Sequence, residues 1–152
     1  MGSQCTGCGI VKGDIKLIGG KIYETENFIL GQDSDVPLKG FLIIQTKEHI
    51  NSILDLNEKA QIELIRLTHK ARLALKELNI CQEVTIVQEE RSKHFHIWLF
   101  PNYDWMQEKF GKGIKYLRDI NEYVIENATE EDKKEVFEVV QKLKKYFNNK
   151  GE

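Results

Sequence analysis

The sequence is poor in proline and cysteine and has no long hydrophobic run. Of its 152 residues, two are proline and three are cysteine. Three cysteines are too few, and odd in number, for a disulfide-stabilised scaffold, so they favour a reducing compartment. The longest apolar runs, at 41–44 and 97–100, fall far short of the roughly 18 residues of a membrane-spanning helix. We therefore expect no transmembrane segment.

An excess of charge of one sign is also lacking. The chain has 22 Lys and Arg against 24 Asp and Glu, a formal net charge of −2, so it carries no overall basic field for nucleic acid or a membrane surface. The N-terminus lacks the basic start and apolar core of a secretory signal. With 41% hydrophobic residues, the chain is long enough to bury a core. We predict a cytoplasmic protein that binds neither nucleic acid nor membrane.

Strand and helix patterns alternate over the first two-thirds of the chain, and helix patterns fill the last third. The clearest helix is predicted at 57–78, where apolar residues recur at steps of three and four. Strands are predicted at 21–24, 27–30, 41–45, 83–88 and 94–100. Two more helices are predicted at 113–127 and 129–147, and the last one opens with a capping box from Thr129 to Asp132.

The segment 94–100 holds the side chains most suited to chemistry. Because side chains alternate between the two faces of a strand, His94, His96 and Trp98 share one face. The two imidazole rings would lie about 7 Å apart and form a concentrated polar site. The alternative interpretation is a surface strand with two satisfied or exposed histidines.

The motif Cys5-Thr6-Gly7-Cys8 indicates metal binding, redox chemistry or no function. A redox motif needs a strand before it and a helix after it, and its place near the N-terminus argues against that context. A tetrahedral zinc site needs two further ligands. The candidates for them are His49, His69, His94, His96 and Cys81. We expect His69 to face water from its helix and Cys81 to be a small buried side chain.

Four motifs follow one another along the chain. They are a Cys-x-x-Cys start, a Tyr-Glu pair followed by an Asp, a glycine-led apolar strand that ends in Lys-x-His, and a strand of alternating histidine and apolar residues. They lie at 5–8, at Tyr23, Glu24 and Asp33, at 40–49 and at 94–100. In this order they resemble the histidine-triad (HIT) superfamily, above all its bacterial zinc-containing members. The resemblance covers about residues 5–101 and departs at the third histidine, which Trp98 replaces.

The resemblance implies an α+β, HIT-like fold, in which a twisted antiparallel sheet of about five strands packs with two helices. It implies a nucleotide-binding domain at 1–104. Residues 105–152 would then be a C-terminal helical extension, which we expect to pack on the same domain. Because family members commonly dimerise, the resemblance also implies a homodimer.

The resemblance also implies roles for individual residues. His96 corresponds to the nucleophile that forms a covalent nucleotidyl-imidazole intermediate. Asp33 and Gln88 correspond to residues that contact the ribose and the phosphate of a nucleotide. In zinc-containing relatives four side chains hold a structural zinc ion. The matching ligands here are Cys5, Cys8, His49 and His94.

Two departures from the family pattern bear on the chemistry. A third histidine can protonate a leaving group, whereas the indole N–H of Trp98 donates a hydrogen bond but is no acid at neutral pH. The loop 89–93 is shorter than the glycine-rich loop of many relatives. Ser92 is therefore our candidate for a phosphate-binding hydroxyl, and Arg91 and Lys93 are candidates for phosphate charge.

We predict an enzyme, a nucleotide hydrolase or nucleotidyl transferase of the HIT type. It would cleave at the α-phosphate of a dinucleoside polyphosphate, such as diadenosine tetraphosphate, or of a related nucleotide conjugate. The predicted catalytic residues are His96 and Trp98, and the predicted nucleotide-binding residues are Asp33, Gln88 and Ser92. Two alternatives stay open: a nucleotide-binding protein without efficient catalysis, and a zinc-stabilised interaction module that uses its C-terminal helices.

Overall fold

One five-stranded antiparallel sheet organises residues 5–149, the part of the chain that the computed structural model describes. Its strands lie in the order β1-β2-β3-β5-β4. They are β1 (Tyr23–Glu24), β2 (Phe28–Gln32), β3 (Leu42–Thr46), β4 (Val84–Gln88) and β5 (His96–Pro101). The predicted α+β class and the five antiparallel strands are confirmed.

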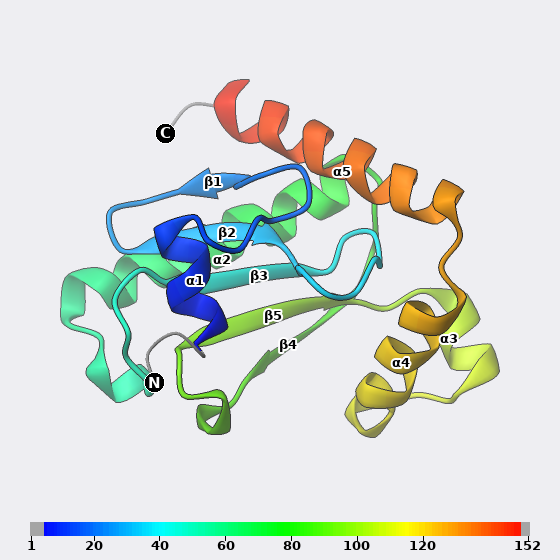
Figure 1. The fold of residues 1–152 in the computed structure, drawn as a ribbon, viewed down its shortest axis with the longest axis horizontal. Coiled ribbons are helices and arrows are strands. Elements are labelled where there is room, and N and C mark those ends of the chain that lie inside the picture. Colours follow the sequence, from blue (N-terminus) through cyan, green and yellow to red (C-terminus); the bar gives the residue numbers. More distant parts are fainter. Residues whose placement is uncertain (1–4, 150–152) are drawn as a thin grey trace.

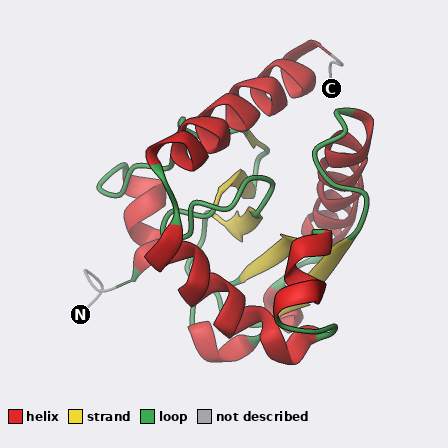
Figure 2. Cartoon of the chain, turned by 90° about the vertical axis from the view of Figure 1, so that its right-hand side faces the viewer, coloured by secondary structure: helices red, strands yellow, loops and turns green. Residues whose placement is uncertain are grey.

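Helices cover both faces of this sheet and one of its ends. They are α1 (Thr6–Lys12), α2 (Glu58–Glu77), α3 (Asp104–Lys109), α4 (Leu117–Asn127) and α5 (Glu130–Asn149). In Figure 1, α1 lies in front of the sheet, α2 lies behind it, and α3 and α4 sit beyond one end of the strands. Figure 2 shows the same layering from the side, with α5 running along the top. None of the helices within 5–149 is long and apolar enough to cross a membrane.

The alternation predicted for β5 is seen in the core. Phe95, Ile97 and Leu99 belong to a first hydrophobic cluster that also contains the buried stripe of α2. Phe100 and Trp98 belong to a second cluster together with side chains of α3 and α4. The two faces of β5 therefore pack against different parts of the core, and α2 does not cover the face that carries His96.

The C-terminal helices contribute to both clusters. From α5, Val140, Leu143 and Phe147 are buried in the first cluster. From α3 and α4, Met106 and Ile120 are buried in the second. The capping box that opens α5 is present, since the N–H of Thr129 donates to Asp132 Oδ2 at 2.9 Å and the N–H of Asp132 donates to Thr129 Oγ1 at 3.1 Å.

The last predicted strand begins later than the sequence pattern suggests. It was expected to start at His94, but β5 starts at His96. The reason is local: Lys93 has a left-handed backbone, with φ 73°, and the N–H of Phe95 donates to the carbonyl of Ile50 at 2.6 Å. His94 consequently sits on the turn that leads into β5 and not in the strand itself.

Candidate functional site

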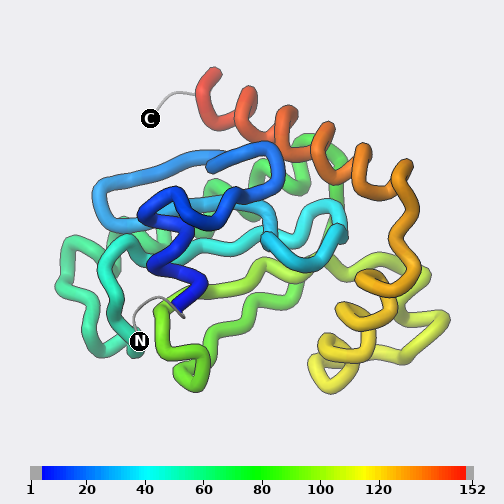
Figure 3. Tube along the Cα trace, viewed as in Figure 1, coloured from blue at the N-terminus to red at the C-terminus, as the bar shows by residue number. Residues whose placement is uncertain are grey.

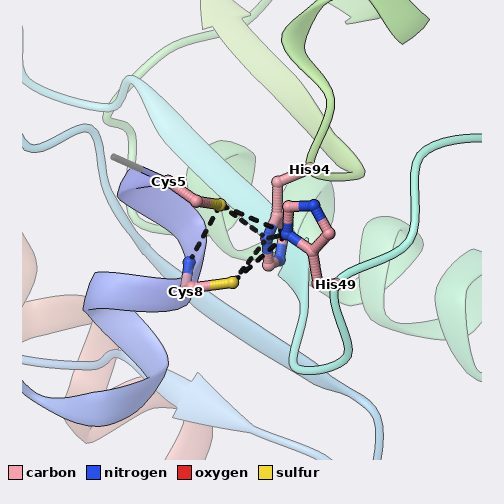
Figure 4. Close-up of side chains that lie close together, drawn as sticks. All are labelled: Cys5, Cys8, His49 and His94. Atoms are coloured by element: carbon pink, nitrogen blue, oxygen red, sulfur yellow. Dashed lines mark hydrogen bonds between the residues drawn. The ribbon is translucent and has the colours of Figure 1, made fainter. Parts of the chain in front are cut away.

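Two cysteine thiols lie together at the start of α1. Cys5 is the N-cap residue, and its sulfur accepts the backbone N–H of Cys8 at 3.4 Å. Both cysteine side chains point toward the same place at this end of the helix, where they meet His49 and His94 (Figure 4). The four predicted zinc ligands are therefore brought together by the fold.

The distances within this Cys/His cluster are those of a metal site. Each thiol sulfur lies 3.2–3.7 Å from the Nδ1 atoms of His49 and His94, and the two Nδ1 atoms are 3.2 Å apart. A tetrahedral zinc with Zn–S and Zn–N bonds of normal length has ligand atoms about 3.3–3.8 Å apart. Two of these five separations lie in that range and the other three, at 3.2 Å, lie just below it, so the cluster fits a structural zinc.

The ring of His94 is oriented for ligation by the backbone. Its Nε2–H donates to the carbonyl of Thr46 at 2.8 Å, which leaves the Nδ1 lone pair directed at the two sulfurs. Burial lowers the pKa of His94, although the bond to Thr46 opposes this effect. Burial thus favours the neutral form of the ring, the form that binds a metal.

Two further residues seat α1 against the sheet, and neither was singled out from the sequence. The side-chain amide of Gln45 donates to the carbonyl of Gly7 at 2.9 Å. A Cβ atom on Gly7 would lie 2.5 Å from the His94 ring, so only glycine allows this approach. Figure 3 shows the result, with the N-terminal segment beside the turn into β5 although 89 residues separate Cys5 from His94.

A cavity of about 720 Å³ opens beside the Cys/His cluster, on the face of the sheet that α2 leaves free. One part of its wall is apolar and comes from α1, the segment after it, and strands β2 and β3. The apolar side chains are Ile10, Leu17, Ile29 and Ile43. The rest of the wall carries four of the five residues predicted for catalysis and nucleotide binding. These are Asp33, Ser92, His96 and Trp98.

His96 has one ring nitrogen bound to the backbone and the other free. Its Nδ1–H donates to the carbonyl of His94 at 3.0 Å, so the neutral ring keeps a lone pair on Nε2. The hydroxyl of Ser92 lies 3.4 Å from the same Nδ1. The half-buried imidazole therefore has the tautomer that a nucleophile needs.

Asp33 belongs to the cavity wall and directly follows the end of β2. Its Oδ2 accepts the backbone N–H groups of Asp35 at 3.0 Å and Val36 at 2.8 Å. Within the described residues Oδ1 has no hydrogen-bond partner. Burial raises the pKa of this carboxyl, and the two backbone N–H groups oppose the shift.

Trp98 is fixed against the aromatic part of the core. Its ring meets that of Phe41 edge to face, with centroids 5.0 Å apart and planes at 82°. Such an arrangement is favourable for aromatic pairs. The indole thus forms a firm part of the cavity wall next to His96.

Gln88 and Arg91 are not brought to the cavity. Gln88 pairs with Ile97, so the register places it on the sheet face opposite to His96, and its amide donates to the Glu89 carbonyl at 3.2 Å. Arg91 is exposed and bonds Glu89 Oε1 at 2.8 Å. Neither residue lines the cavity, and we do not carry either into the proposed site.

The other ligand candidates lie elsewhere in the fold. His69 is exposed on α2, and Cys81 is buried in the first hydrophobic cluster at 4% exposure. Both placements were expected. Among the described residues, only the Cys5, Cys8, His49 and His94 set forms such a ligand group.

Comparison with solved structures identifies the fold, whereas comparison of the sequence does not. No family model and no curated protein matches the sequence, whereas many solved structures match the fold. A histidine triad nucleotide-binding protein of Sulfolobus tokodaii superposes with a TM-score of 0.67 at 18% identity, over 96% of this chain and 95% of that chain. A zinc-bound histidine triad protein of Mycobacterium smegmatis gives 0.64 at 18% identity, over 97% and 100%.

A third structure agrees with these two. A member of the HIT family from Bacillus subtilis has a TM-score of 0.61 at 20% identity, over 91% of this chain and 96% of that chain. The three superpositions cover at least 91% of this chain and at least 95% of each of the other chains. The chain therefore has the histidine-triad fold, and it carries a cysteine and histidine cluster that fits a structural zinc.

Proposed function

We propose that this protein is a nucleotide hydrolase or nucleotidyl transferase that acts on dinucleoside polyphosphates, with diadenosine tetraphosphate as the leading substrate, or on a related nucleotide conjugate. The observation that carries the proposal is the tautomer of His96. The bond from Nδ1–H to the His94 carbonyl leaves a nucleophilic Nε2 in the cavity wall. His96 is thus the catalytic residue.

The cavity is suited to a nucleotide from end to end. The apolar wall offers a surface for a base, and the free Oδ1 of Asp33 can accept a ribose hydroxyl. Ser92 and His96 lie where a phosphate would meet both a hydroxyl donor and the nucleophile. The base, the ribose and the phosphate of a nucleotide therefore each have a matching group in the cavity wall.

The proposed reaction has two steps. Nε2 of His96 attacks the α-phosphorus, and the electron pair of the P–O bond departs with the leaving phosphate. The ring keeps its Nδ1 proton on the His94 carbonyl and carries the positive charge of the intermediate. Water, or another acceptor, then attacks the phosphorus, releases its proton to solvent and returns the P–N electron pair to Nε2.

Zinc would have a structural role in this scheme. Cys5, Cys8, His49 and His94 would hold it with no position left open for substrate, as in other closed sites with four protein ligands. Bound there, it would fix α1 to the turn that carries His94. The three cysteines are free thiols, which suits the reducing cytoplasm that we predict for this protein.

The covalent intermediate gives a direct test. Intact-protein mass spectrometry after mixing with diadenosine tetraphosphate, with quenching that avoids acid, should show a nucleotidyl adduct on wild type and none on His96→Ala. No adduct and no product, with nucleotide still raising the melting temperature, would indicate a binding protein instead. Absence of any nucleotide-dependent stabilisation would favour an interaction module.

Trp98 sets the proposed class of leaving group. Because the indole cannot supply a proton, the leaving group must be stable as an anion, as a polyphosphate is and an amine is not. Wild type should therefore cleave diadenosine tetraphosphate faster than adenosine phosphoramidate. Trp98→His should gain rate chiefly on the phosphoramidate. A wild-type preference for the phosphoramidate would contradict this assignment.

We also propose a homodimer formed through β4. This strand is the last in the sheet order, with β5 as its one neighbour among the described strands, and Ile86 on it is 52% exposed. An open edge of this kind pairs readily with another strand. Light scattering coupled to gel filtration should show a dimer that Ile86→Glu converts to monomer. Ile125→Glu on α4, where the isoleucine is 53% exposed, should leave it intact.

A further inference from the structure

Lys93, one of the residues that line the cavity, has an unfavourable backbone conformation. Among the described residues only Asn79 and Lys93 have a positive φ without being glycine, at 58° and 73°. Asparagine adopts this region readily, but lysine does not, because its Cβ approaches the backbone carbonyl. Lys93 ends the short 3-10 turn Glu90–Ser92, where its backbone N–H donates to the Glu90 carbonyl at 3.3 Å. Lysine carries a conformational cost at this position that glycine would not.

The other charged side chains of the loop 89–93 have partners. Arg91 bonds Glu89 through both Nε and a terminal nitrogen, at 3.1 and 2.8 Å. Glu90 accepts the hydroxyl of Ser52 at 2.6 Å. Within residues 5–149, the side chain of Lys93 forms no ion pair and no hydrogen bond. Its charge is therefore available for a ligand.

The distribution of charge along the cavity indicates which ligand group this charge serves. Of the described residues in the wall, Asp33 and Asp35 are acidic, and Lys93 alone carries a permanent positive charge. Lys93 lies in the chain between Ser92 and His94, on the turn that leads to His96. The cation is thus at the phosphate end and the carboxylates are at the ribose end.

Resting on the proposed function, we propose that Lys93 is a specificity-determining residue that binds the phosphates beyond the α-position. When Nε2 of His96 displaces the leaving group, the electron pair of the P–O bond adds negative charge to the departing phosphate. The Lys93 ammonium pairs with this charge and takes no part in proton transfer, because Trp98 supplies no acid. Lys93 therefore selects for polyphosphate chains over nucleoside monophosphates.

Binding measurements on the zinc-loaded full chain test this role. Dissociation constants for AMP and for α,β-methylene ATP, which cannot be cleaved at the α-phosphate, are compared in wild type, Lys93→Gln, Lys93→Arg and Lys93→Gly. Lys93→Gln should weaken binding of the ATP analogue about tenfold and that of AMP less than twofold. Lys93→Arg should keep the preference, and the preference of wild type should shrink as salt screens the charge.

Two matched controls separate charge from backbone effects. Arg91→Gln removes a neighbouring cation that does not line the cavity and should leave both constants unchanged. Lys93→Gly should raise the melting temperature by removing the left-handed lysine, yet lose the ATP preference as Lys93→Gln does. Asn79→Gly, at the other left-handed position, should leave the preference intact.

The outcomes distinguish this inference from the proposed function. If wild type binds both nucleotides and Lys93→Gln keeps the full advantage of the ATP analogue, the role of Lys93 is wrong while nucleotide binding stands. If wild type binds neither nucleotide, the proposed function fails and this role fails with it. A Lys93→Gly variant that keeps the preference would also overturn the inference.

Discussion

His94 and His96 stand two residues apart and are held in opposite ways. His94 donates from Nε2 to the Thr46 carbonyl at 2.8 Å and presents Nδ1 to the two cysteines. His96 donates from Nδ1 to the His94 carbonyl at 3.0 Å and keeps Nε2 free. In both rings a backbone carbonyl selects the tautomer, so the backbone decides which nitrogen is left for metal or for chemistry.

The comparison also shows that the two sites are joined. The carbonyl that orients His96 belongs to His94, whose own ring is fixed by the Cys/His cluster. A metal bound there would therefore limit the movement of the carbonyl that orients His96, the proposed nucleophile. The candidate metal ligand His94 and the proposed nucleophile His96 thus use different ring nitrogens, but they share one short turn of backbone.

The largest expected effect comes from removing each histidine in turn. His96→Ala should lower turnover of diadenosine tetraphosphate by at least about 1000-fold, because the proposed nucleophile is lost, and should leave zinc content and melting temperature nearly unchanged. His94→Ala should lose zinc and stability together. Metal analysis, melting temperature and turnover on both variants would measure this, and substantial turnover in His96→Ala would contradict the assigned nucleophile.

Removing a thiol tests the metal side alone. Wild type should contain about one zinc per chain, and Cys8→Ser should bind little and lose about 3–5 kcal/mol of unfolding free energy, since metal binding contributes to folding. For a chain of this size that corresponds to a melting temperature lower by roughly 10 °C. Cys81→Ala, at a buried thiol outside the cluster, is the control and should retain the zinc of wild type.

A smaller effect is expected from crowding the contact between α1 and His94. The added methyl of Gly7→Ala would lie 2.5 Å from the His94 ring, so α1 must shift, at a cost of about 1–3 kcal/mol. Zinc affinity should fall, while the tautomer of His96 and the turnover should be less affected. Thr6→Ala, an exposed neighbour on the same helix, is the control and should leave zinc affinity unchanged. Normal zinc affinity in Gly7→Ala would refute this packing argument.

Particular residues show how much of the fold and the site could be predicted from the sequence. The set Cys5, Cys8, His49 and His94 followed from the resemblance to the histidine-triad superfamily, because the residues alone left other histidines and Cys81 open as ligands. The helix predicted at 57–78, in contrast, was visible as a periodic apolar stripe. α2 follows that stripe closely because its apolar residues face one sheet. Local patterns of this kind carry their own structural information.

What the sequence missed depends on contacts between distant segments. Gln88 was expected near phosphate, but its pairing with Ile97 depends on the register between β4 and β5, and a shift of one residue reverses the face. Gln45 and Gly7 meet only because α1 docks on β3. No pattern within either segment indicates that contact.

A third region, remote from both histidines, provides the smallest and most selective test. Glu63 of α2 accepts the hydroxyl of Thr25, and it accepts the backbone N–H and side-chain amide of Asn27, both at 2.7 Å. Burial alone would raise the pKa of Glu63, but these hydrogen bonds outweigh it and leave the pKa below its ordinary value. The carboxylate therefore holds the turn between β1 and β2 to the helix.

A carboxyl whose pKa is lowered by folding contributes stability above its unfolded pKa and loses that contribution as pH falls through the folded value. Glu63→Gln should therefore cost about 1–2 kcal/mol at pH 7, and the difference from wild type should shrink below about pH 4. Chemical denaturation at several pH values would measure it. Both chains carry the same metal ligands, so zinc release cancels in the difference. Glu138→Gln, exposed on α5, is the control. A destabilisation by Glu63→Gln that stays constant with pH would contradict the lowered pKa of Glu63. A loss of zinc or turnover in this variant would show that the contact is not independent of the two histidine sites.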